Sequence, residues 1–338
     1  MALFKKIAAL TDLHVGGKSN SQTHLADCEE YVDWFIETAK KNGCETGISM
    51  GDWHNNRNNI NLVTLDTSIR LLEKLGKAFD NFFWFPGNHD LFHKDRRDIH
   101  SSIFGKHIPG ITVVNEVTTK DEVTMVPWLV GDEWKKIQKI KSKYMFGHFE
   151  LPEFYMNGQI LMPDHNQLKL EHLKSQDLVF SGHFHKRQNR GNVWYIGNAF
   201  PHNYGDAGDD TRGMMVLEWG KDPQFFNWSN APKYRNLKLS ELIDQKDQIM
   251  KTKMYLRVEM DIDISFEEAN FLKETFMAEY NIREFSLIAQ HKNVESGTTD
   301  DSPAKFDSVD TIVKRELLSI ESDSFDKSVL LDIYKNLQ

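Results

Sequence analysis

The chain has 338 residues, of which 40% are hydrophobic, and a formal net charge of −9. This length predicts about two domains, and the hydrophobic fraction excludes a chain that is disordered throughout. No apolar run reaches the roughly 18 residues needed to cross a bilayer, and Lys5 and Lys6 interrupt the N-terminus, which argues against a secretory signal. The negative charge argues against a basic nucleic-acid coat protein. It does not exclude a nuclease, because bound metal ions add positive charge.

The two cysteines, Cys28 and Cys44, are too few and too far apart for a secreted disulfide scaffold. Cys28 falls in a predicted helix, and Cys44 comes just before a predicted strand. We therefore expect free thiols and a reducing compartment. That compartment is most simply the cytoplasm, which would be the host cytoplasm for a viral protein.

Strand patterns alternate with amphipathic helix patterns at the start of the chain. The strands are predicted at 4–10, 45–50 and 82–85, and the helices at 25–40 and 62–79. This alternation predicts a layered α/β domain with a largely parallel sheet. From residue 111 short strand patterns dominate, and we expect them to form a second, more antiparallel sheet packed on the first. These strands are predicted at 111–115, 122–126, 143–146, 178–180, 193–196, 214–219 and 224–227.

The remainder of the chain predicts smaller units after a main domain at 1–230. Residues 230–247 are mostly polar and are interpreted as a connection. Residues 248–290 predict a small β-α-β domain, whose helix begins with a capping box of Ser265 and Glu268. Residues 291–304 are rich in Ser, Thr, Gly and Asp and predict a flexible linker. Residues 305–338 carry two helical patterns with apolar stripes, which fold back on the main body or dock onto a partner.

Five short motifs, each placed where a predicted strand ends, carry candidate metal ligands. In chain order they are Asp12-Leu13-His14-Val15-Gly16, Gly51-Asp52, Gly87-Asn88-His89-Asp90, Gly147-His148 and Gly182-His183-Phe184-His185. Open α/β sheets bind ligands at the carboxyl ends of their strands. Asp, His and Asn side chains without Cys favour Mn²⁺, Fe²⁺ or Zn²⁺ over a thiolate site. Each motif alone is weak, but the whole series predicts a metal centre, in which two ions could clamp a phosphate and activate a water.

This ordered series resembles the calcineurin-like metallophosphoesterase superfamily over roughly residues 1–230. The resemblance implies a four-layer α-β-β-α sandwich, here with a small β-α-β cap domain and C-terminal helices, and a dinuclear site. One ion would be held by Asp12, His14, Asp52 and His185. The other would be held by Asp52 as a bridge with Asn88, His148 and His183. His89 would be the general acid that protonates the leaving oxygen, and Asp90 would orient it.

Within the superfamily the layout resembles the nuclease branch, which contains SbcD and the double-strand-break repair nucleases of the meiotic recombination eleven type. Its length and layout look closest to the recombination endonuclease subunits of T-even-like phages. The resemblance implies a Mn²⁺-dependent DNA exonuclease and endonuclease, a homodimer that binds an SMC-like coiled-coil ATPase through its terminal helices. Many of these nucleases have a His three residues after the bridging Asp. Here that residue is Asn55, so the role of the neighbouring His54 stays open.

Basic residues in the motif loops are candidate contacts for DNA phosphates. They are Lys18, Arg57, Lys94, Arg96, Arg97, Lys186, Arg187 and Arg190. The alternative is ordinary solvated loop charge, because Asp95 and Asp98 partly offset these cations. The stretch 198–212 matches nothing specific in the family. Two other functions stay open, a phosphatase of the same superfamily and a non-catalytic scaffold.

Overall fold

The computed structural model describes residues 2–156, 160–280, 282–289 and 329. All described residues except Val329 belong to one compact unit, Met1–Gln290. The predicted linker and terminal helices lie outside the described residues, apart from Val329. Within the described ranges, no helix is both long enough and apolar enough to span a membrane.

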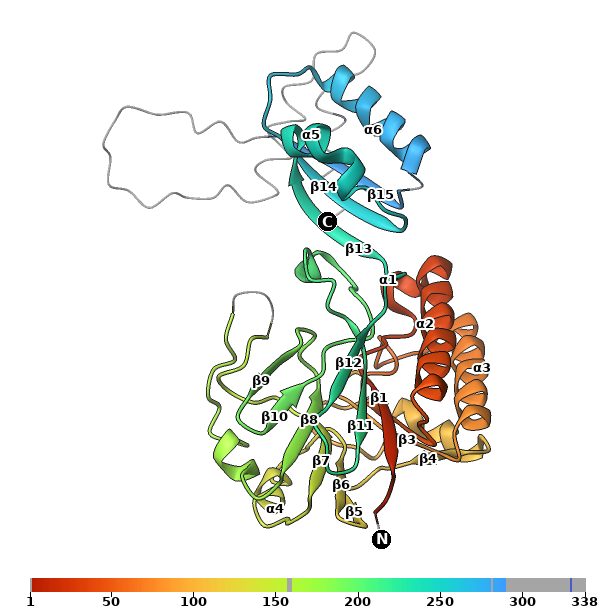
Figure 1. The fold of residues 1–338 in the computed structure, drawn as a ribbon, viewed down its shortest axis with the longest axis vertical. Helices are drawn as coiled ribbons and strands as arrows, with labels where there is room; N and C mark the ends of the chain where they lie inside the picture. The colour runs from red at the N-terminus through yellow and green to blue at the C-terminus, as the bar shows by residue number, and fades with distance from the viewer. Residues whose placement is uncertain (1, 157–159, 281, 290–328, 330–338) are drawn as a thin grey trace, which may run out of the picture. The chain divides into compact units, whose positions relative to one another are not determined.

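A six-stranded sheet with the strand order β12-β11-β1-β2-β3-β4 forms one inner layer of this unit (Figure 1). Four strands run parallel, namely β1 (Lys6–Leu10), β2 (Thr46–Met50), β3 (Asn81–Phe85) and β4 (Ile111–Val113). On the other side of β1, β11 (Gly213–Glu218) and β12 (Gln224–Asn227) are antiparallel. All five residues of β2 are buried, as expected for a parallel strand that is covered on both faces.

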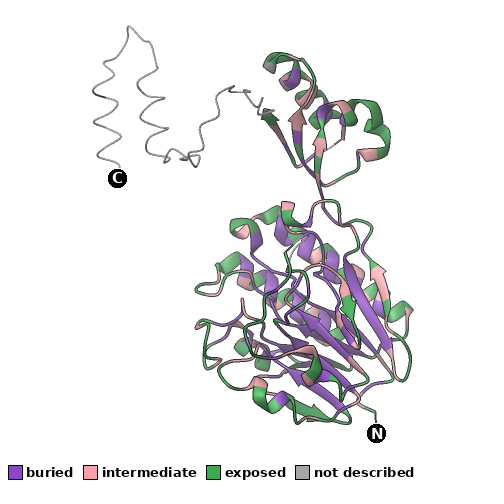
Figure 2. Ribbon diagram, turned by 90° about the vertical axis from the view of Figure 1, so that its left-hand side faces the viewer, coloured by how far each residue is buried: buried purple, intermediate pink, exposed green. Residues whose placement is uncertain are grey.

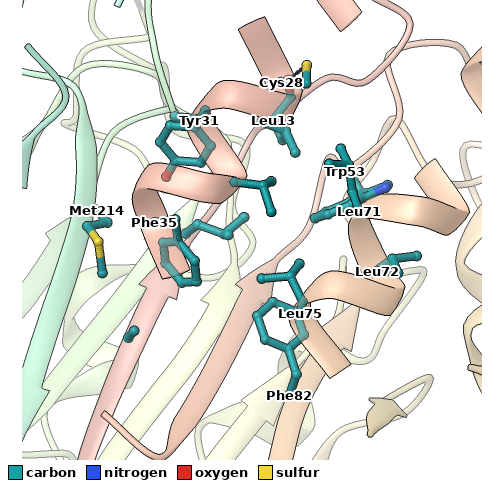
Figure 3. Packing of buried hydrophobic residues seen from close by; sticks show 14 of the residues in the cluster. Leu13, Cys28, Tyr31, Phe35, Trp53, Leu71, Leu72, Leu75, Phe82 and Met214 are labelled. Carbon is teal, nitrogen blue, oxygen red and sulfur yellow. Dashed lines mark hydrogen bonds between the residues drawn. The ribbon is translucent and has the colours of Figure 1, made fainter. Parts of the chain in front are cut away.

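Two long helices, α2 (Gln22–Lys41) and α3 (Leu62–Ala78), cover the outer face of this sheet. Their apolar residues recur at helical spacing and point inward. Figure 3 shows Tyr31 and Phe35 of α2 and Leu75 of α3 packed together near the strands. The Asn61 side chain caps α3 by accepting the N–H of Val63 at 2.9 Å. A short turn, α1 (Gly17–Asn20), connects the first motif to α2.

The second sheet has the order β5-β6-β7-β8-β10-β9. Its strands are β5 (Thr118–Lys120), β6 (Val123–Val126), β7 (Tyr144–His148), β8 (Leu178–Gly182), β9 (Gln188–Arg190) and β10 (Val193–Tyr195). The expectation of a more antiparallel sheet was wrong, because the four central strands pair in parallel and only the edge strands are antiparallel. The predicted strands that became β4, β11 and β12 belong to the first sheet. The connections contain only short helical segments, α4 (Trp134–Ile137) and η2 (Leu170–Leu173), which leave almost no periodic pattern in the sequence.

The two sheets pack face to face around an apolar core that joins Ile7 and Phe85 of the first sheet to Phe146 and Phe180 of the second. Buried residues follow the strands of both sheets in Figure 2. On the outer face of the second sheet, Ile137 of α4 and other side chains form a third cluster. A 3₁₀ segment, η1 (Ser101–His107), precedes β4, and another, η3 (Tyr204–Asp206), precedes β11. The predicted α/β class is confirmed.

A small three-stranded parallel sheet with the order β13-β14-β15 follows. Its elements are β13 (Lys233–Lys238), α5 (Leu239–Ile249), β14 (Met254–Met260), α6 (Phe266–Tyr280) and β15 (Glu284–Ala289). The interpretation of 230–247 as a connection was wrong, because this stretch contains β13 and α5. Only Leu239 and Leu242 of α5 are fully buried, too few for a clear helical pattern. The predicted capping box is confirmed, since Ser265 Oγ accepts the Glu268 N–H at 3.2 Å and Glu268 Oε2 accepts the Ser265 N–H at 3.0 Å.

Candidate active site

All five motifs meet at the carboxyl ends of β1, β2, β3, β7 and β8. Their side chains form two groups, and the potential ligand atoms of each group lie within 4.8 Å of one another. The first group is Asp12, His14 and His185, and the second is Asp52, His148 and His183. Asn88 joins the second group, because its Oδ1 lies 2.9 Å from His183 Nδ1 and 3.1 Å from His148 Nε2. The structure therefore brings all seven predicted ligands together.

His14 lies at the centre of the first group and is only 5% exposed. Burial lowers the pKa of His14 well below its ordinary value, so the ring is neutral at pH 7. Neither ring nitrogen has a hydrogen-bond partner among the described residues, although both are buried. A buried polar atom without a partner is costly. A neutral His14 ring has one nitrogen whose lone pair is free to bind a divalent ion. The group of Asp12, His14 and His185 therefore fits a metal.

A hydrogen bond to the backbone fixes the His148 ring in the second group. Its Nδ1 donates to the Met50 carbonyl at 2.7 Å, which leaves Nε2 facing Asp52 Oδ2 at 3.4 Å. Burial alone would lower the pKa of His148, but the Asp52 carboxylate outweighs it and raises the pKa to about 9. Burial would likewise raise the pKa of Asp52, but His148 and His14 hold it far below its usual range. A positive charge is thus favoured beside the Asp52 carboxylate. In the metal-loaded protein a divalent ion would take the place of the proton on the His148 ring.

Asp52 lies between the two groups. Its Oδ2 is 3.4 Å from His148 Nε2 and 3.9 Å from His14 Nε2, while its Oδ1 accepts the His89 N–H at 2.8 Å. The turn of the third motif packs directly on this carboxylate. A Cβ at Gly87 would come within 2.2 Å of Asp52 Oδ1, so this position requires glycine. Asp52 therefore has the location that a carboxylate bridging two ions needs.

His89 projects toward the first group, with its ring centroid 4.9 Å from that of His14. Its Nδ1 donates to the Asn55 carbonyl at 2.8 Å, so this carbonyl orients the ring. Asp90 makes no hydrogen bond to the His89 ring within the described residues, so any effect of Asp90 on His89 is indirect. The buried Asp90 carboxylate accepts the N–H groups of Gly87 at 2.9 Å and His54 at 3.0 Å, and so ties two motif loops together.

His54 lies beneath the site rather than in it. The side chain is 1% exposed, and its two ring nitrogens lie 2.8 Å from Ser101 Oγ and 3.0 Å from Ser68 Oγ. Trp53 is buried too and donates its indole N–H to Ser68 Oγ at 2.7 Å. Both residues therefore stabilise the second motif loop from below, and neither is exposed to a substrate.

The predicted DNA contacts fall into two classes. The prediction for Arg97 was wrong, because its side chain is 7% exposed and forms a double ion pair with Glu133 and hydrogen bonds to two carbonyls. Arg187 donates to the Ile196 carbonyl and to Asn227 Oδ1, and Arg190 pairs with Glu153 at 2.6 Å. The other predicted cations are exposed or half-buried, and their contact with DNA stays a prediction. They are Lys18, Arg57, Lys94, Arg96 and Lys186.

Four residues around the site did not follow from the motifs. Glu150 Oε1 lies 3.5 Å from His183 Nε2, and the Trp128 ring lies 5.0 Å from the His183 ring. His202 and Asp206 come from the unassigned stretch 198–212, and Asp206 Oδ2 lies 4.0 Å from His185 Nδ1. The only sequence signal was proximity, since Glu150 follows His148 by two residues. A cavity of about 560 Å³ lies beside His185 and one of about 310 Å³ beside His148.

Comparison with known proteins identifies the class. Residues 5–187 match the family described as calcineurin-like phosphoesterase, so the chain belongs to this family. The family uses a dinuclear metal centre, which agrees with the two groups of candidate ligands. Among individual proteins, the chain is 28% identical over 280 residues to exonuclease subunit 1 of Enterobacteria phage T4. That match covers 79% of this chain and 81% of the relative.

Solved structures match as well, among them a phosphoesterase and a nuclease. The phosphoesterase Yfce from E. coli has a TM-score of 0.32 and 12% identity, over 63% of this chain and 88% of that protein. The nuclease MPE from Pseudomonas putida has a TM-score of 0.29 and 18% identity, over 56% of this chain and 66% of that protein.

Proposed function

We propose that this protein is the nuclease subunit of a DNA-processing complex, a dinuclear metal-dependent exonuclease and endonuclease that acts in double-strand-break processing and recombination. The observation that carries the proposal is Asp52, which lies between two sets of candidate ligands with His89 beside them. The relative in phage T4 is named an exonuclease subunit, which supports a nuclease that works with a partner.

The seven predicted ligands would hold the two ions, with Asp52 shared between them. The donor atoms are oxygens of Asp and Asn and nitrogens of His, and we propose Mn²⁺ as the ion that they hold. Two bound ions supply positive charge against the phosphate and lower the pKa of a water.

His89 would supply the proton. Its Nδ1–H is committed to the Asn55 carbonyl, which leaves Nε2 to donate a proton to the leaving oxygen of the cleaved strand. Asp90 would contribute indirectly, because it holds the Gly87 turn from which His89 projects. His89 would therefore act as the general acid, and Asp90 would act as a positioning residue.

DNA would lie against the exposed cations near the site, which include Lys94 and Arg96. The partner would be an SMC-like coiled-coil ATPase bound through residues 305–338, with the nuclease as a homodimer. We place this complex in a reducing cytoplasm, where the buried thiols of Cys28 and Cys44 stay free. A chain that ends at His291 should keep its metal and fail to bind the ATPase. Loss of its metal would contradict docking through the terminal segment alone.

The test of the activity compares two substrates. The Mn²⁺-loaded chain should degrade linear duplex DNA, and removal of the metal with EDTA should abolish this. Hydrolysis of p-nitrophenyl phosphate without cleavage of DNA would instead identify a phosphatase. Absence of both activities from a metal-loaded chain would favour a scaffold.

A further inference from the structure

Two histidines that are not predicted ligands hold the backbone of the first motif. His202 Nε2 lies 2.9 Å from the Asp12 carbonyl, and His24 Nε2 lies 2.9 Å from the His14 carbonyl. A carbonyl oxygen only accepts hydrogen bonds, so both imidazoles carry a hydrogen on Nε2. Asp12 and His14 each have a φ of 52°, a left-handed conformation that residues other than glycine rarely adopt. The two donated hydrogen bonds therefore stabilise a ligand loop in an unfavourable conformation.

Both histidines are connected to the small sheet of β13, β14 and β15. His24 lies on α2 one turn before Asp27, whose carboxylate accepts two N–H groups of Arg283 at 2.5 Å and 2.9 Å. Lys253 adds an ion pair to Asp27 at 3.3 Å. This carboxylate is 3% exposed, so the ion pairs are shielded from water. The first connection thus runs from the residues that immediately precede β14 and β15, through α2, to the His14 carbonyl.

The second connection begins at Tyr234 of β13. Its hydroxyl donates to the His202 carbonyl at 2.8 Å, and its own carbonyl accepts the Gly208 N–H at 3.1 Å. The Tyr234 ring is stacked on Tyr255 of β14, with ring centroids 4.6 Å apart and an interplanar angle of 7°. The His202 ring packs edge-on against the rings of His14 and His185. The small sheet is therefore joined through His202 to all three residues of the first group.

The second ligand group has no such connection within the described residues. His148 is held by the Met50 carbonyl, and His183 by Glu150 and by the carboxylate of Asp12. Asn88 Oδ1 lies within hydrogen-bonding distance of His148 Nε2 and His183 Nδ1, both ligands of the same group. Within the described residues, the small sheet thus reaches the first ligand group directly and the second only through Asp12 and Asp52.

We propose that the small sheet sets the metal affinity of the Asp12, His14 and His185 position alone, with His24 and His202 as the positioning residues that transmit its effect. The inference rests on the proposed function only in requiring that the two groups hold ions. A displacement of the small sheet would release one ion, leave the other bound, and so stop two-metal chemistry without unfolding the site.

The experiment titrates Mn²⁺ into the full chain and follows two signals, the number of ions bound by calorimetry and the spin-coupled Mn²⁺ pair by electron paramagnetic resonance. The wild-type chain should bind two ions. Tyr234→Phe and Arg283→Met each cut one connection. Each should weaken one ion by about 10–100-fold, the usual effect of residues that support metal ligands. The combined variant should weaken the same ion further and replace the coupled signal with that of a single ion.

Two further variants separate positioning from general damage. His202→Gln keeps an N–H donor near the Asp12 carbonyl and should retain both ions, whereas His202→Leu should lose one. Arg70→Ala is the matched control, because it removes an arginine ion pair to Glu29 of the same helix α2 without touching the small sheet. It should leave both ions unchanged.

Unchanged affinities in the combined variant, or equal weakening of both ions, would overturn the proposal. Tyr234→Phe removes a single oxygen, so it carries the test even if His202→Leu fails to fold. A wild-type chain that binds no Mn²⁺ would instead refute the proposed function, which is a distinct result.

Discussion

In the group of Asp52, His148 and His183, one ligand lies within a strand, whereas the backbone of Asp12 and His14 in the other group is held by histidines from other segments. His148 is the last residue of β7, is fully buried, and is fixed by a carbonyl of β2. His14 lies on a left-handed loop whose carbonyls are held by His24 and His202. Two sites of similar chemistry thus differ in how they are held, because His148 is fixed within the sheets while the Asp12 and His14 carbonyls are fixed by histidines from other segments.

The largest expected effect comes from the residue shared by both groups. Asp52→Ala should abolish binding of both ions and all phosphodiesterase activity, because one carboxylate serves the two positions. Metal content and DNA cleavage measure this directly. A variant that still bound two Mn²⁺ per chain would show that Asp52 does not bridge.

Next in size is the removal of the predicted acid. His89→Ala should keep both ions and slow cleavage by about 10²–10⁴-fold, the usual contribution of general acid catalysis. The Asn55 carbonyl would lose its donor, but no predicted ligand would be removed. If the variant lost metal together with activity, His89 would belong to one of the ligand groups.

A pair of neighbouring arginines provides a smaller and more selective contrast. Arg97→Ala should lower the free energy of unfolding by about 1–3 kcal/mol, because it leaves Glu133 and two carbonyls without their donor. Arg96→Ala should leave stability within about 0.5 kcal/mol but reduce the salt dependence of DNA binding by about one slope unit. An unchanged slope would assign Arg96 to ordinary solvated charge.

A last contrast concerns the pH dependence of the metal-free chain. The pKa of His148 is raised to about 9 in the folded chain, against about 6.5 when unfolded. Its stabilising contribution is therefore complete below pH 6.5 and is lost as the pH rises to 9. The melting temperature should fall over this range by roughly 2–4 °C for each kcal/mol lost. Asp52→Asn removes the charge that raises this pKa, so an equal fall in that variant would contradict the assignment.

The sequence predicted the parts of the structure that are formed by contiguous segments of the chain. The buried strands β1 to β3 and the motifs after them are contiguous segments, so their residue types indicated both the parallel sheet and the ligands. The pairing of β6, β7 and β8 was missed, because their connections contain too little helix to show a period. The partners of Asp90 and Arg97 were missed as well, because a hydrogen bond to Gly87 or Glu133 depends on how separate loops are brought together.

The support of the first ligand group could not be predicted for the same reason. His24 and His202 are separated by 178 positions and meet only because both carbonyls of one short loop face them. No motif marks either residue, and the polar stretch that contains β13 shows no clear strand pattern. What the sequence carries is the chemistry of the ligands, and what only the fold reveals is how each ligand is held.

The most direct test of the account is a crystal structure of the chain soaked in Mn²⁺, with the ions located by their anomalous scattering. We expect two peaks, one among Asp12, His14 and His185 and one among Asn88, His148 and His183, with Asp52 in contact with both. A single peak, or two peaks that do not share Asp52, would contradict it.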